Sequence, residues 1–252
     1  MRVPSTVVME LTEEHEDQHL DAQFELARLG NYYQWILNNF GDSIGHRVWD
    51  AGAGIGSVTS LLTKRCDFVL ATEYGERNLK ILRQTFDGHA DVAVDYCDLT
   101  MNSVSRFASY DLDTVISLDV LEHLKDDCFA LKQFHRVLKS DGRVLIKVPA
   151  HEVLYCSIDE ASLHYRRYSK SQLGEALISS GFVLEQLRYM NWVATIPYFI
   201  KGRLLKPRRN FSRSIKKERL SLYNQLMPWL ERLERIVPPP FGLSVIAVGR
   251  KA

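Results

Sequence analysis

The chain has 252 residues, of which 46% are hydrophobic and 25% are charged. This composition is that of an ordinary globular protein, so it excludes a disordered or collagen-like chain. Lys and Arg total 32 and Asp and Glu total 31, a formal net charge of +1 that disfavours a globally basic nucleic-acid binder. The charges are unevenly placed, because residues 10–25 carry seven acids and no Lys or Arg, whereas residues 201–219 carry nine Lys or Arg and one acid.

The cysteines and the N-terminus indicate the compartment. Cys66, Cys97, Cys128 and Cys156 are too far apart for a Cys-x-x-Cys motif, which favours free thiols in a reducing environment. The N-terminal sequence has no apolar segment of signal-peptide length. No stretch reaches the roughly 20 apolar residues that a membrane span needs. These features predict a cytoplasmic protein.

The hydrophobic pattern predicts helices that alternate with strands. Residues 15–40 are expected to be helical, with Gly30-Asn31 dividing them into two helices. In chain order, the segments that follow are a strand at 46–50, a helix at 57–64, a strand at 68–72, a helix at 78–86, strands at 92–94 and 114–117, a helix at 128–138, a strand at 143–148, a helix at 171–179, and strands at 182–189 and 243–249. This alternation is typical of an α/β protein with a mainly parallel sheet and helices on both faces.

The last two expected strands are separated by roughly fifty residues, which is too long for a simple loop in a compact domain. Residues 220–237 have a helical pattern, so we expect a helical, basic insert over 193–240. The N-terminal region, 1–45, is expected to be helical. Its residues Tyr32, Tyr33 and Trp35 either cover a ligand cleft as a lid or pack into the core as an ordinary amphipathic helix.

A glycine-rich turn follows the first strand, in the sequence Asp50-Ala-Gly52-Ala-Gly54-Ile-Gly56. Glycines allow close approach of the backbone to a ligand, and the helix that follows offers free N–H groups. Dinucleotide sites use nearly the same turn, so the turn alone does not identify the ligand. A carboxylate at the end of the second strand, Glu73, can accept the hydroxyls of a ribose. Asp98 follows the third strand.

Five segments in order are VWDAGAGIGSVTSLL, VLATEYG, DYCDL, DTVISLDVLEHLKDD and FHRVLKSDGRVLIKVPA, and they span about residues 46–150. They resemble the motifs of class I S-adenosylmethionine-dependent methyltransferases of the broad type 11/12 groups. The resemblance implies a Rossmann-like, seven-stranded, mostly parallel sheet with an antiparallel last strand. It also implies S-adenosyl-L-methionine as cofactor and a catalytic domain over 46–192 and 241–252.

The resemblance further implies which residues hold the cofactor. The three glycines line its methionine part, Asp50 holds the amino group through the turn, Glu73 holds the ribose, and Asp98 meets the adenine amine. The full set expected to bind the cofactor is Asp50, Gly52, Gly54, Gly56, Glu73, Tyr74, Asp98, Leu99, Leu118 and Asp119.

The segment after the fourth strand contains Asp119, Glu122 and His123, which a helix would place on one face. One interpretation is that the Glu-His pair is structural or faces the acceptor. The other is a divalent metal site, because a similar acid-x-x-Glu-His occurs in ubiquinone-pathway O-methyltransferases and small-RNA 2′-O-methyltransferases, where it can bind metal. A fourth ligand is not evident, since His151 or His164 would have to fold back. No residue is therefore assigned to a metal.

The loop beyond residue 150 is expected to form one wall of the acceptor pocket. It resembles the His-Tyr-Arg-Arg-Tyr loop of bacterial methyltransferases, whose acceptors vary widely. In the alternative interpretation the loop only closes on itself, with Ser169 or Ser171 capping the next helix. The candidate bases are His164, His151 and His123, and the residues expected to contact the acceptor are Tyr33, Tyr155, Tyr165, Arg166, Arg167 and Trp192.

The expected reaction is transfer of a methyl group to an O or N atom of a small molecule from a natural-product or glycan pathway. The basic insert leaves open a lipid-linked acceptor at a membrane surface through 193–219, a lid for a soluble acceptor, and a solvated or oligomer-forming face. Nucleic acid is not expected, because the sequence lacks Asp-Pro-Pro-Tyr, Asn-Pro-Pro-Tyr and Pro-Cys motifs. The rivals are a nicotinamide-dependent oxidoreductase and a non-catalytic binding module.

Overall fold

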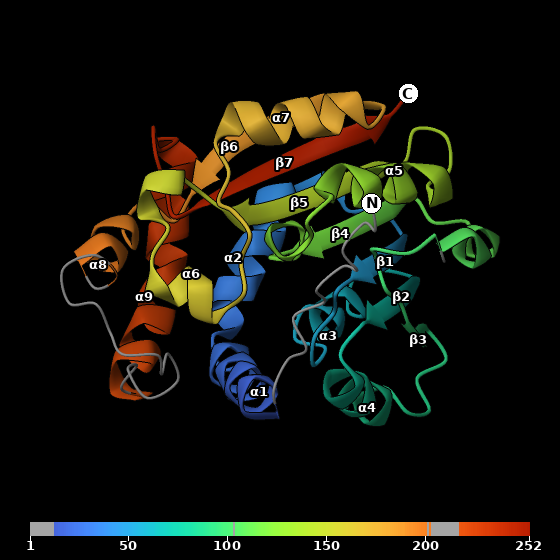
Figure 1. The fold of residues 1–252 in the computed structure, drawn as a ribbon, viewed down its shortest axis with the longest axis horizontal. Helices are drawn as coiled ribbons and strands as arrows, with labels where there is room; N and C mark the ends of the chain where they lie inside the picture. Colours follow the sequence, from blue (N-terminus) through green and yellow to red (C-terminus); the bar gives the residue numbers. More distant parts are fainter. Residues whose placement is uncertain (1–12, 103, 201, 203–216) are drawn as a thin grey trace, which may run out of the picture.

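A seven-stranded sheet forms the centre of the molecule (Figure 1). The computed structural model describes residues 13–102, 104–200, 202 and 217–252. The strands lie in the order β3-β2-β1-β4-β5-β7-β6. Their bounds are β1 Arg47–Ala51, β2 Phe68–Glu73, β3 Val92–Tyr96, β4 Thr114–Leu118, β5 Arg143–Pro149, β6 Phe182–Met190 and β7 Ser244–Lys251.

The first five strands pair in parallel, and β7 is antiparallel to both β5 and β6. This is the Rossmann-like sheet that the sequence predicted, with one antiparallel strand inserted beside β6. In parallel sheets of this kind, ligands bind beyond the carboxyl ends of the strands. A ligand site in this fold is therefore expected at the carboxyl ends of β1 to β5.

Helices cover the sheet on both faces. Within the described residues they are α1 Glu13–Ala27, α2 Gly30–Phe40, α3 Thr59–Leu62, α4 Glu76–Thr85, α5 Asp127–Val137, α6 Ser157–Ala161, α7 Lys170–Ser179, α8 Thr195–Phe199 and α9 Lys217–Ile236. Short 3-10 turns lie at η1 Gly41–Ser43, η2 Val104–Tyr110, η3 Leu121–His123 and η4 Glu152–Leu154. The expected division of the N-terminal helix at Gly30 is present, since α1 ends at Ala27.

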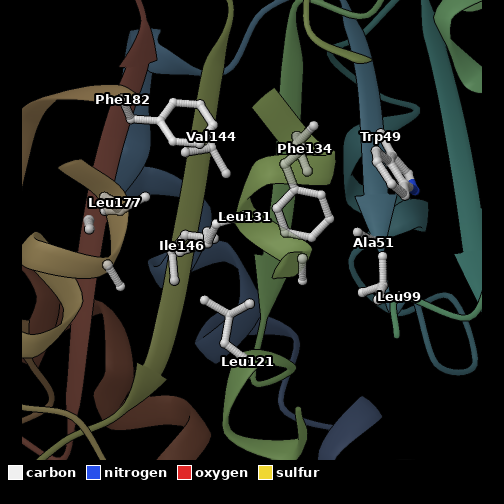
Figure 2. Close-up of a cluster of buried hydrophobic side chains, with 14 of the residues drawn as sticks. Trp49, Ala51, Leu99, Leu121, Leu131, Phe134, Val144, Ile146, Leu177 and Phe182 are labelled. Atoms are coloured by element: carbon white, nitrogen blue, oxygen red, sulfur yellow. The ribbon is translucent and has the colours of Figure 1, made fainter. Parts of the chain in front are cut away.

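One face of the sheet packs against α5, α7 and η2 (Figure 2). The rings of Phe107 and Phe134 lie edge-on to Trp49, with centroids 5.1 and 5.2 Å away. All three side chains are fully buried. Because aromatic and aliphatic burial is the main stabilising contribution to a fold, this layer fixes β1 and β4 in place.

The opposite face packs against α2 and α9. Trp35, Ile36 and Leu37 of α2 meet Met227 of α9 and strand residues such as Val48 in one buried cluster. Helices α8 and α9 lie between β6 and β7 in the chain, at the end of the sheet farthest from β3 (Figure 1). Among the described residues, no helix is both long and apolar enough to cross a membrane.

Helix α7 shows how the sequence fixes a boundary. The Ser169 hydroxyl accepts a hydrogen bond from the Gln172 N–H (3.2 Å), and the Gln172 side chain accepts one from the Ser169 N–H (2.8 Å). This reciprocal pair is a capping box, which satisfies two donors that the first helical turn leaves unpaired. Ser169 is therefore the helix cap, one of the two candidates, Ser169 and Ser171, that the sequence offered.

Candidate active site

The glycine-rich turn joins β1 to α3. Gly52, Gly54 and Gly56 have φ angles of +82°, +58° and +92°, which L side chains rarely adopt. A Cβ atom at Gly52 would lie 2.5 Å from a methyl carbon of Val120, and one at Gly56 would lie 2.6 Å from the Phe86 ring. All three glycines are therefore favoured by backbone conformation, and Gly52 and Gly56 are also required by close packing.

Asp50 lies at the end of β1 and is only 3% exposed. Its Oδ2 accepts a hydrogen bond from the Thr59 hydroxyl, at 2.7 Å. Burial raises the pKa of Asp50 to about 6, and the charge of Glu73 adds to the shift, while the bond from Thr59 opposes it. An ionised carboxylate that is buried in this way would be stabilised by a cationic ligand group bound beside the turn.

Glu73 ends β2 and supports the turn directly. Its carboxylate accepts hydrogen bonds from the N–H groups of Gly54 (2.8 Å), Gly75 (2.8 Å) and Tyr74 (2.9 Å). Burial raises the pKa of Glu73, and these three N–H groups act against that rise. An ionised carboxylate offers about four acceptor positions, so three backbone donors leave room for a ligand hydroxyl.

The remaining residues expected at the cofactor follow β2, β3 and β4. The side chain of Tyr74 is exposed, and its ring centroid lies 6.0 Å from that of Tyr96. The Asp98 carboxylate accepts bonds from the N–H and the hydroxyl of Thr100, while Leu99 is buried. Leu118 ends β4 and packs against the α2 side of the core. The expected residues therefore follow the ends of neighbouring parallel strands.

The structure corrects the sequence expectation for Asp119. A shared helix face with Glu122 and His123 is wrong, because the helical segment is only the 3-10 turn Leu121–His123, and Asp119 precedes it with a φ of +55°. Both carboxylate oxygens of Asp119 lie 2.5 and 2.6 Å from the Lys147 ammonium. The Lys147 side chain is buried in β5, so Asp119 neutralises a cation inside the sheet edge.

Lys147 depends on this partner. Burial by itself would lower the pKa of the ammonium, but Asp119, Tyr32 and Glu122 hold that pKa above its usual value. The ammonium also lies 5.7 Å from the centroid of the Tyr32 ring, which α2 supplies. Neither Lys147 nor its pairing with Asp119 was predicted from the sequence.

His164 lies beside Glu122 and His123, although the two segments are distant in sequence. One ligand atom from each of the three side chains lies within 4.8 Å of the other two. The two imidazole rings are edge-on, with centroids 4.7 Å apart. The connection is made by the backbone, because the Tyr165 N–H donates to the Glu122 carbonyl at 2.8 Å. The folding back of His164 that the sequence left open is present.

A buried carboxylate, Asp159 of α6, organises the acceptor-side loop. It accepts bonds from His164 Nδ1 (2.9 Å), Arg167 Nε (2.8 Å) and the Cys156 N–H (3.0 Å). Burial alone would raise the pKa of Asp159, but these donors hold it below its usual value. Asp159 was not assigned to the site from the sequence, because nothing in its spacing from His164 indicates the contact.

Both arginines of this loop have partners within the protein. Arg167 is buried against Asp159 and over the Tyr198 ring, and Arg166 lies 3.2 Å from Asp127. Each guanidinium group thus has an anionic partner within the protein, Asp159 of the same loop for Arg167 and Asp127 of α5 for Arg166. The assignment of Arg166 and Arg167 to an anionic acceptor stays a prediction.

The remaining residues expected at the acceptor side, and the candidate base His151, each have different neighbours. The His151 ring stacks on Tyr189, with centroids 4.6 Å apart, and burial together with Arg167 lowers its pKa. The Tyr155 hydroxyl donates to the His164 carbonyl at 2.8 Å, and Tyr165 is exposed.

Two further candidates, Tyr33 and Trp192, lie outside this loop. Burial and Asp119 raise the pKa of the Tyr33 hydroxyl. The Trp192 N–H donates to Glu234 at 2.9 Å, so Trp192 belongs to the α9 side.

Part of the chain is similar in sequence to known proteins. Residues 49–146 match a family model described as a methyltransferase domain. The ubiquinone biosynthesis O-methyltransferase of Pseudomonas aeruginosa is 30% identical over 112 residues, which are 44% of this chain and 47% of that protein. The chain thus spans about half the length of the curated relatives it matches. Residues 49–146 are therefore similar to a methyltransferase domain, and the segments that resemble class I S-adenosylmethionine-dependent methyltransferases lie almost entirely within this match.

Solved structures of methyltransferases share the fold of this chain. The protein in complex with the Haloferax volcanii Trm112 methyltransferase activator has a TM-score of 0.63 at 17% identity, and the match covers 97% of this chain and 99% of that one. Haemonchus contortus phosphoethanolamine N-methyltransferase 2, in complex with S-adenosyl-L-methionine, has a TM-score of 0.56 at 20% identity, covering 88% of this chain and 52% of that one. Both likenesses concern the fold.

The residues of the candidate site fit S-adenosylmethionine, the cofactor that the sequence predicted. Its amino group and ribose hydroxyls are donors, and Asp50 and Glu73 are acceptors at the turn. Gln23 of α1 lies 3.2 Å from the Cβ position of Gly54, and its Oε1 is buried with no hydrogen-bond partner among the described residues. An unpaired acceptor beside the turn is consistent with a ligand that brings a donor.

Cofactor affinity is expected to fall as the pH is lowered through about 6, the pKa of Asp50. A cationic amino group favours the ionised carboxylate, so protonation of Asp50 should cost about tenfold in affinity per pH unit below that value. The stability of the protein without cofactor changes with pH in the opposite direction to the affinity. Because the pKa of Asp50 is raised on folding, its contribution to stability is present at low pH and is lost as the pH rises through about 6.

Calorimetric titration with S-adenosylhomocysteine between pH 5 and 8 measures this dependence. The Asp50→Asn variant should bind S-adenosylhomocysteine more weakly at pH 8, and its affinity should lose most of its dependence on pH. A variant with the full wild-type slope would show that another group, such as a histidine, controls the titration.

Proposed function

We propose that this protein is a methyltransferase that moves a methyl group from S-adenosylmethionine to an oxygen or nitrogen atom of a small molecule from a natural-product or glycan pathway. The observation that carries the proposal is a juxtaposition: the acidic, glycine-rich turn at β1 and β2 lies on the same sheet edge as the Glu122, His123 and His164 cluster beyond β4. The names of an O-methyltransferase relative and an N-methyltransferase neighbour support either acceptor atom.

The chain's own residues have a limited task in this reaction. When bound, S-adenosylmethionine supplies a methyl group already activated on a sulfonium, so alignment and exclusion of water provide much of the rate. A bond forms from the acceptor atom to the methyl carbon, the carbon–sulfur electron pair stays on sulfur, and the acceptor's proton passes to a base. Asp159 bonds Nδ1 of His164, which leaves Nε2 to take that proton.

Two measurements test the proposal. Calorimetry should show micromolar binding of S-adenosylmethionine and no binding of NAD, whereas binding of NAD alone would support the oxidoreductase alternative. Transfer of a labelled methyl group should then be followed over a panel of phenols, sugars, amines and lipid-linked glycans. Cofactor binding without transfer to any member of a broad panel would contradict this acceptor class and favour a binding module.

The His164→Ala variant is expected to lower turnover by at least about tenfold while cofactor affinity stays within about twofold, because general bases typically contribute factors of 10² to 10⁴. The matched control is His46→Ala, which removes an exposed histidine 3.5 Å from Asp67, away from the cluster. Equal losses of turnover and cofactor affinity in His164→Ala would contradict an acceptor-side role.

A second candidate is a lipid-linked acceptor at an anionic membrane surface, and a specific feature favours it. Helix α9 exposes Leu226, Trp229, Leu233 and Ile236, which lie on one face, and Trp229 and Ile236 are 68% and 78% exposed. The sequence between α8 and α9 carries the basic cluster, and an apolar face beside basic residues is typical of binding to an anionic interface. Residues 203–216 lie outside the described residues, so this candidate rests on their sequence.

Sedimentation with vesicles of phosphatidylserine and phosphatidylcholine tests this surface. Trp229→Glu and Ile236→Glu should reduce binding to the anionic vesicles, and neutralising Lys206, Arg208 and Arg209 should weaken it while leaving cofactor binding intact. Ile178→Glu is the control, because Ile178 is also an exposed aliphatic residue but lies on α7. Absence of any vesicle binding by the unmodified chain would eliminate the membrane candidate.

A further inference from the structure

Asp159 of α6 is a buried carboxylate whose acceptor positions are all occupied. Its side chain is 0% exposed. Oδ1 accepts hydrogen bonds from His164 Nδ1 (2.9 Å) and Arg167 Nε (2.8 Å). Oδ2 accepts them from the Cys156 N–H (3.0 Å) and the Tyr198 hydroxyl (3.1 Å). An ionised carboxylate offers about four acceptor positions, so these donors leave no position for a ligand. Any role of Asp159 in a reaction must therefore be exerted through one of the four groups.

Of these four donors, His164 is the one that can act on another molecule. The Cys156 donor is a backbone N–H group. The Arg167 guanidinium is buried, and its Nη1 also donates to the Ala150 carbonyl at 3.2 Å. The Tyr198 hydroxyl is itself an acceptor for the Cys156 thiol at 3.7 Å. His164 has a second ring nitrogen, Nε2, and its side chain is 16% exposed. The imidazole therefore connects the buried carboxylate to the candidate site.

The carboxylate determines which nitrogen of His164 carries the proton. Burial alone would raise the pKa of Asp159, but His164, Arg167 and the Cys156 N–H hold that pKa below its usual value, so the group is ionised. An ionised carboxylate requires an N–H at Nδ1, and the lone pair of the neutral imidazole then lies on Nε2. The same carboxylate lies beside the positive charge that the ring acquires when Nε2 takes up a proton.

Tyr198 brings a part of the insert to this carboxylate. It lies in α8, which follows β6 in the chain, whereas Asp159 lies in α6, which follows β5. A second contact lies just beyond α8, where a Cβ atom at Gly202 would be 2.5 Å from the Cys156 Sγ. Glycine at this position therefore permits the close approach of the insert. Two positions of the insert thus fit against the segment that orients the candidate base.

We propose that Asp159 and Tyr198 are positioning residues for His164, and that the insert completes the base of the reaction through the Tyr198 hydroxyl. Asp159 fixes the lone pair on Nε2, while Tyr198 and the Cys156 N–H hold the second carboxylate oxygen and so prevent its rotation. When the acceptor's proton passes to Nε2, the ring becomes an imidazolium, Asp159 stays ionised beside it, and the proton later leaves to water. The catalytic consequence rests on the proposed function, but the tautomer of His164 does not.

Nitrogen-15 NMR of the histidine rings in the full-length chain measures the tautomer without any acceptor. The His164→Gln spectrum assigns the resonances. We expect neutral His164 to carry its proton on Nδ1. In Asp159→Asn, one amide oxygen has to serve four donors, so the Nε2–H tautomer should become populated. A smaller increase of the Nε2–H tautomer is expected in Tyr198→Phe.

Turnover with an acceptor from the panel described above is the second measurement. We expect kcat to fall by about 100-fold in Asp159→Asn, because the wrong histidine tautomer costs a serine protease about 10⁴-fold. A fall of about tenfold is expected in Tyr198→Phe, which is the effect of one hydrogen bond to a charged group. The KM for S-adenosylmethionine should stay within about twofold in both variants, because neither residue belongs to the glycine-rich turn.

Tyr223→Phe is the matched control for Tyr198→Phe. Tyr223 is also a partly buried tyrosine of the insert, but its hydroxyl donates to the neutral Asn191 Oδ1, at 2.8 Å. Asp113→Asn is the control for Asp159→Asn, because Asp113 accepts backbone N–H groups at the amino end of β1, the end opposite to the candidate site. Both controls should keep the turnover and the His164 tautomer of the unmodified chain.

Three results would overturn the inference: an Nε2–H tautomer of His164 in the unmodified chain, unchanged turnover in Tyr198→Phe, or equal losses in Tyr198→Phe and Tyr223→Phe. The proposed function would stand in each case. Circular dichroism checks folding, and Tyr198→Phe, which removes a single oxygen atom, carries the test if Asp159→Asn does not fold. If the unmodified chain transfers no methyl group, the proposed function fails. The His164 tautomer then decides the inference, and equal tautomer populations in Tyr198→Phe and the unmodified chain would reject it.

Discussion

Glu73→Gln is expected to weaken S-adenosylmethionine binding by about 100-fold. The carboxylate both accepts ribose hydroxyls and holds the Gly54, Tyr74 and Gly75 N–H groups, and an amide offers one oxygen in place of two. Hydrogen bonds to a charged group contribute about 1.5 to 3 kcal/mol each, so the loss of one or two bonds corresponds to this factor. Calorimetric titration with the cofactor measures the change directly.

The control for this prediction is Glu76→Gln. Glu76 lies three residues further on, in the first turn of α4, where it is exposed. Its substitution should leave cofactor affinity within about twofold and stability within about 0.5 kcal/mol. An equal effect of the two substitutions would show that the local negative charge, and not the position of the Glu73 carboxylate, determines binding. Unchanged affinity in Glu73→Gln would remove the ribose assignment.

The part of the site that the sequence predicted is the part that the sheet determines. Asp50 and Glu73 end neighbouring parallel strands, β1 and β2, whose pairing places Asp50 opposite Ala71. Strand ends in a parallel sheet meet at one edge, so local patterns were sufficient to place these carboxylates together. The glycine turn was also predictable from a local pattern, because its three positive φ angles favour glycine at those positions.

The acceptor side was less predictable because it depends on contacts between distant segments. The sequence spacing of Asp119, Glu122 and His123 indicates a shared face only if the segment is helical, and the structure replaces that helix by a three-residue turn. His164 lies in the loop after β5. This loop returns to the end of that strand, where Tyr168 forms a bridge with Ala150, and the return brings His164 beside Glu122. Such contacts leave no periodic signal in a single sequence.

Asp119→Asn is expected to destabilise the fold by about 2 kcal/mol, whereas Lys147→Met should cost less than about 1 kcal/mol. The difference follows from burial, because the Lys147 side chain is 3% exposed and the Asp119 side chain is 49% exposed. Removing the anion leaves a buried ammonium without its partner, and breaking such pairs typically costs about 3 to 5 kcal/mol, reduced here because water reaches Asp119. Asparagine tolerates the positive φ of this position, so the substitution changes mainly the charge.

The double variant Asp119→Asn/Lys147→Met completes the cycle. Met fills the position of the lysine stem in a strand whose other residues from Val144 to Pro149 are apolar, and the neutral amide at position 119 then faces no buried cation. The double variant should therefore be about as stable as Lys147→Met alone, which gives a coupling of about 2 kcal/mol between the two sites. Urea unfolding with an unchanged slope measures each free energy of unfolding. Additive losses would mean that the ammonium is stabilised by Tyr32 and the strand backbone rather than by Asp119, and the electrostatic account of this sheet edge would then be incorrect.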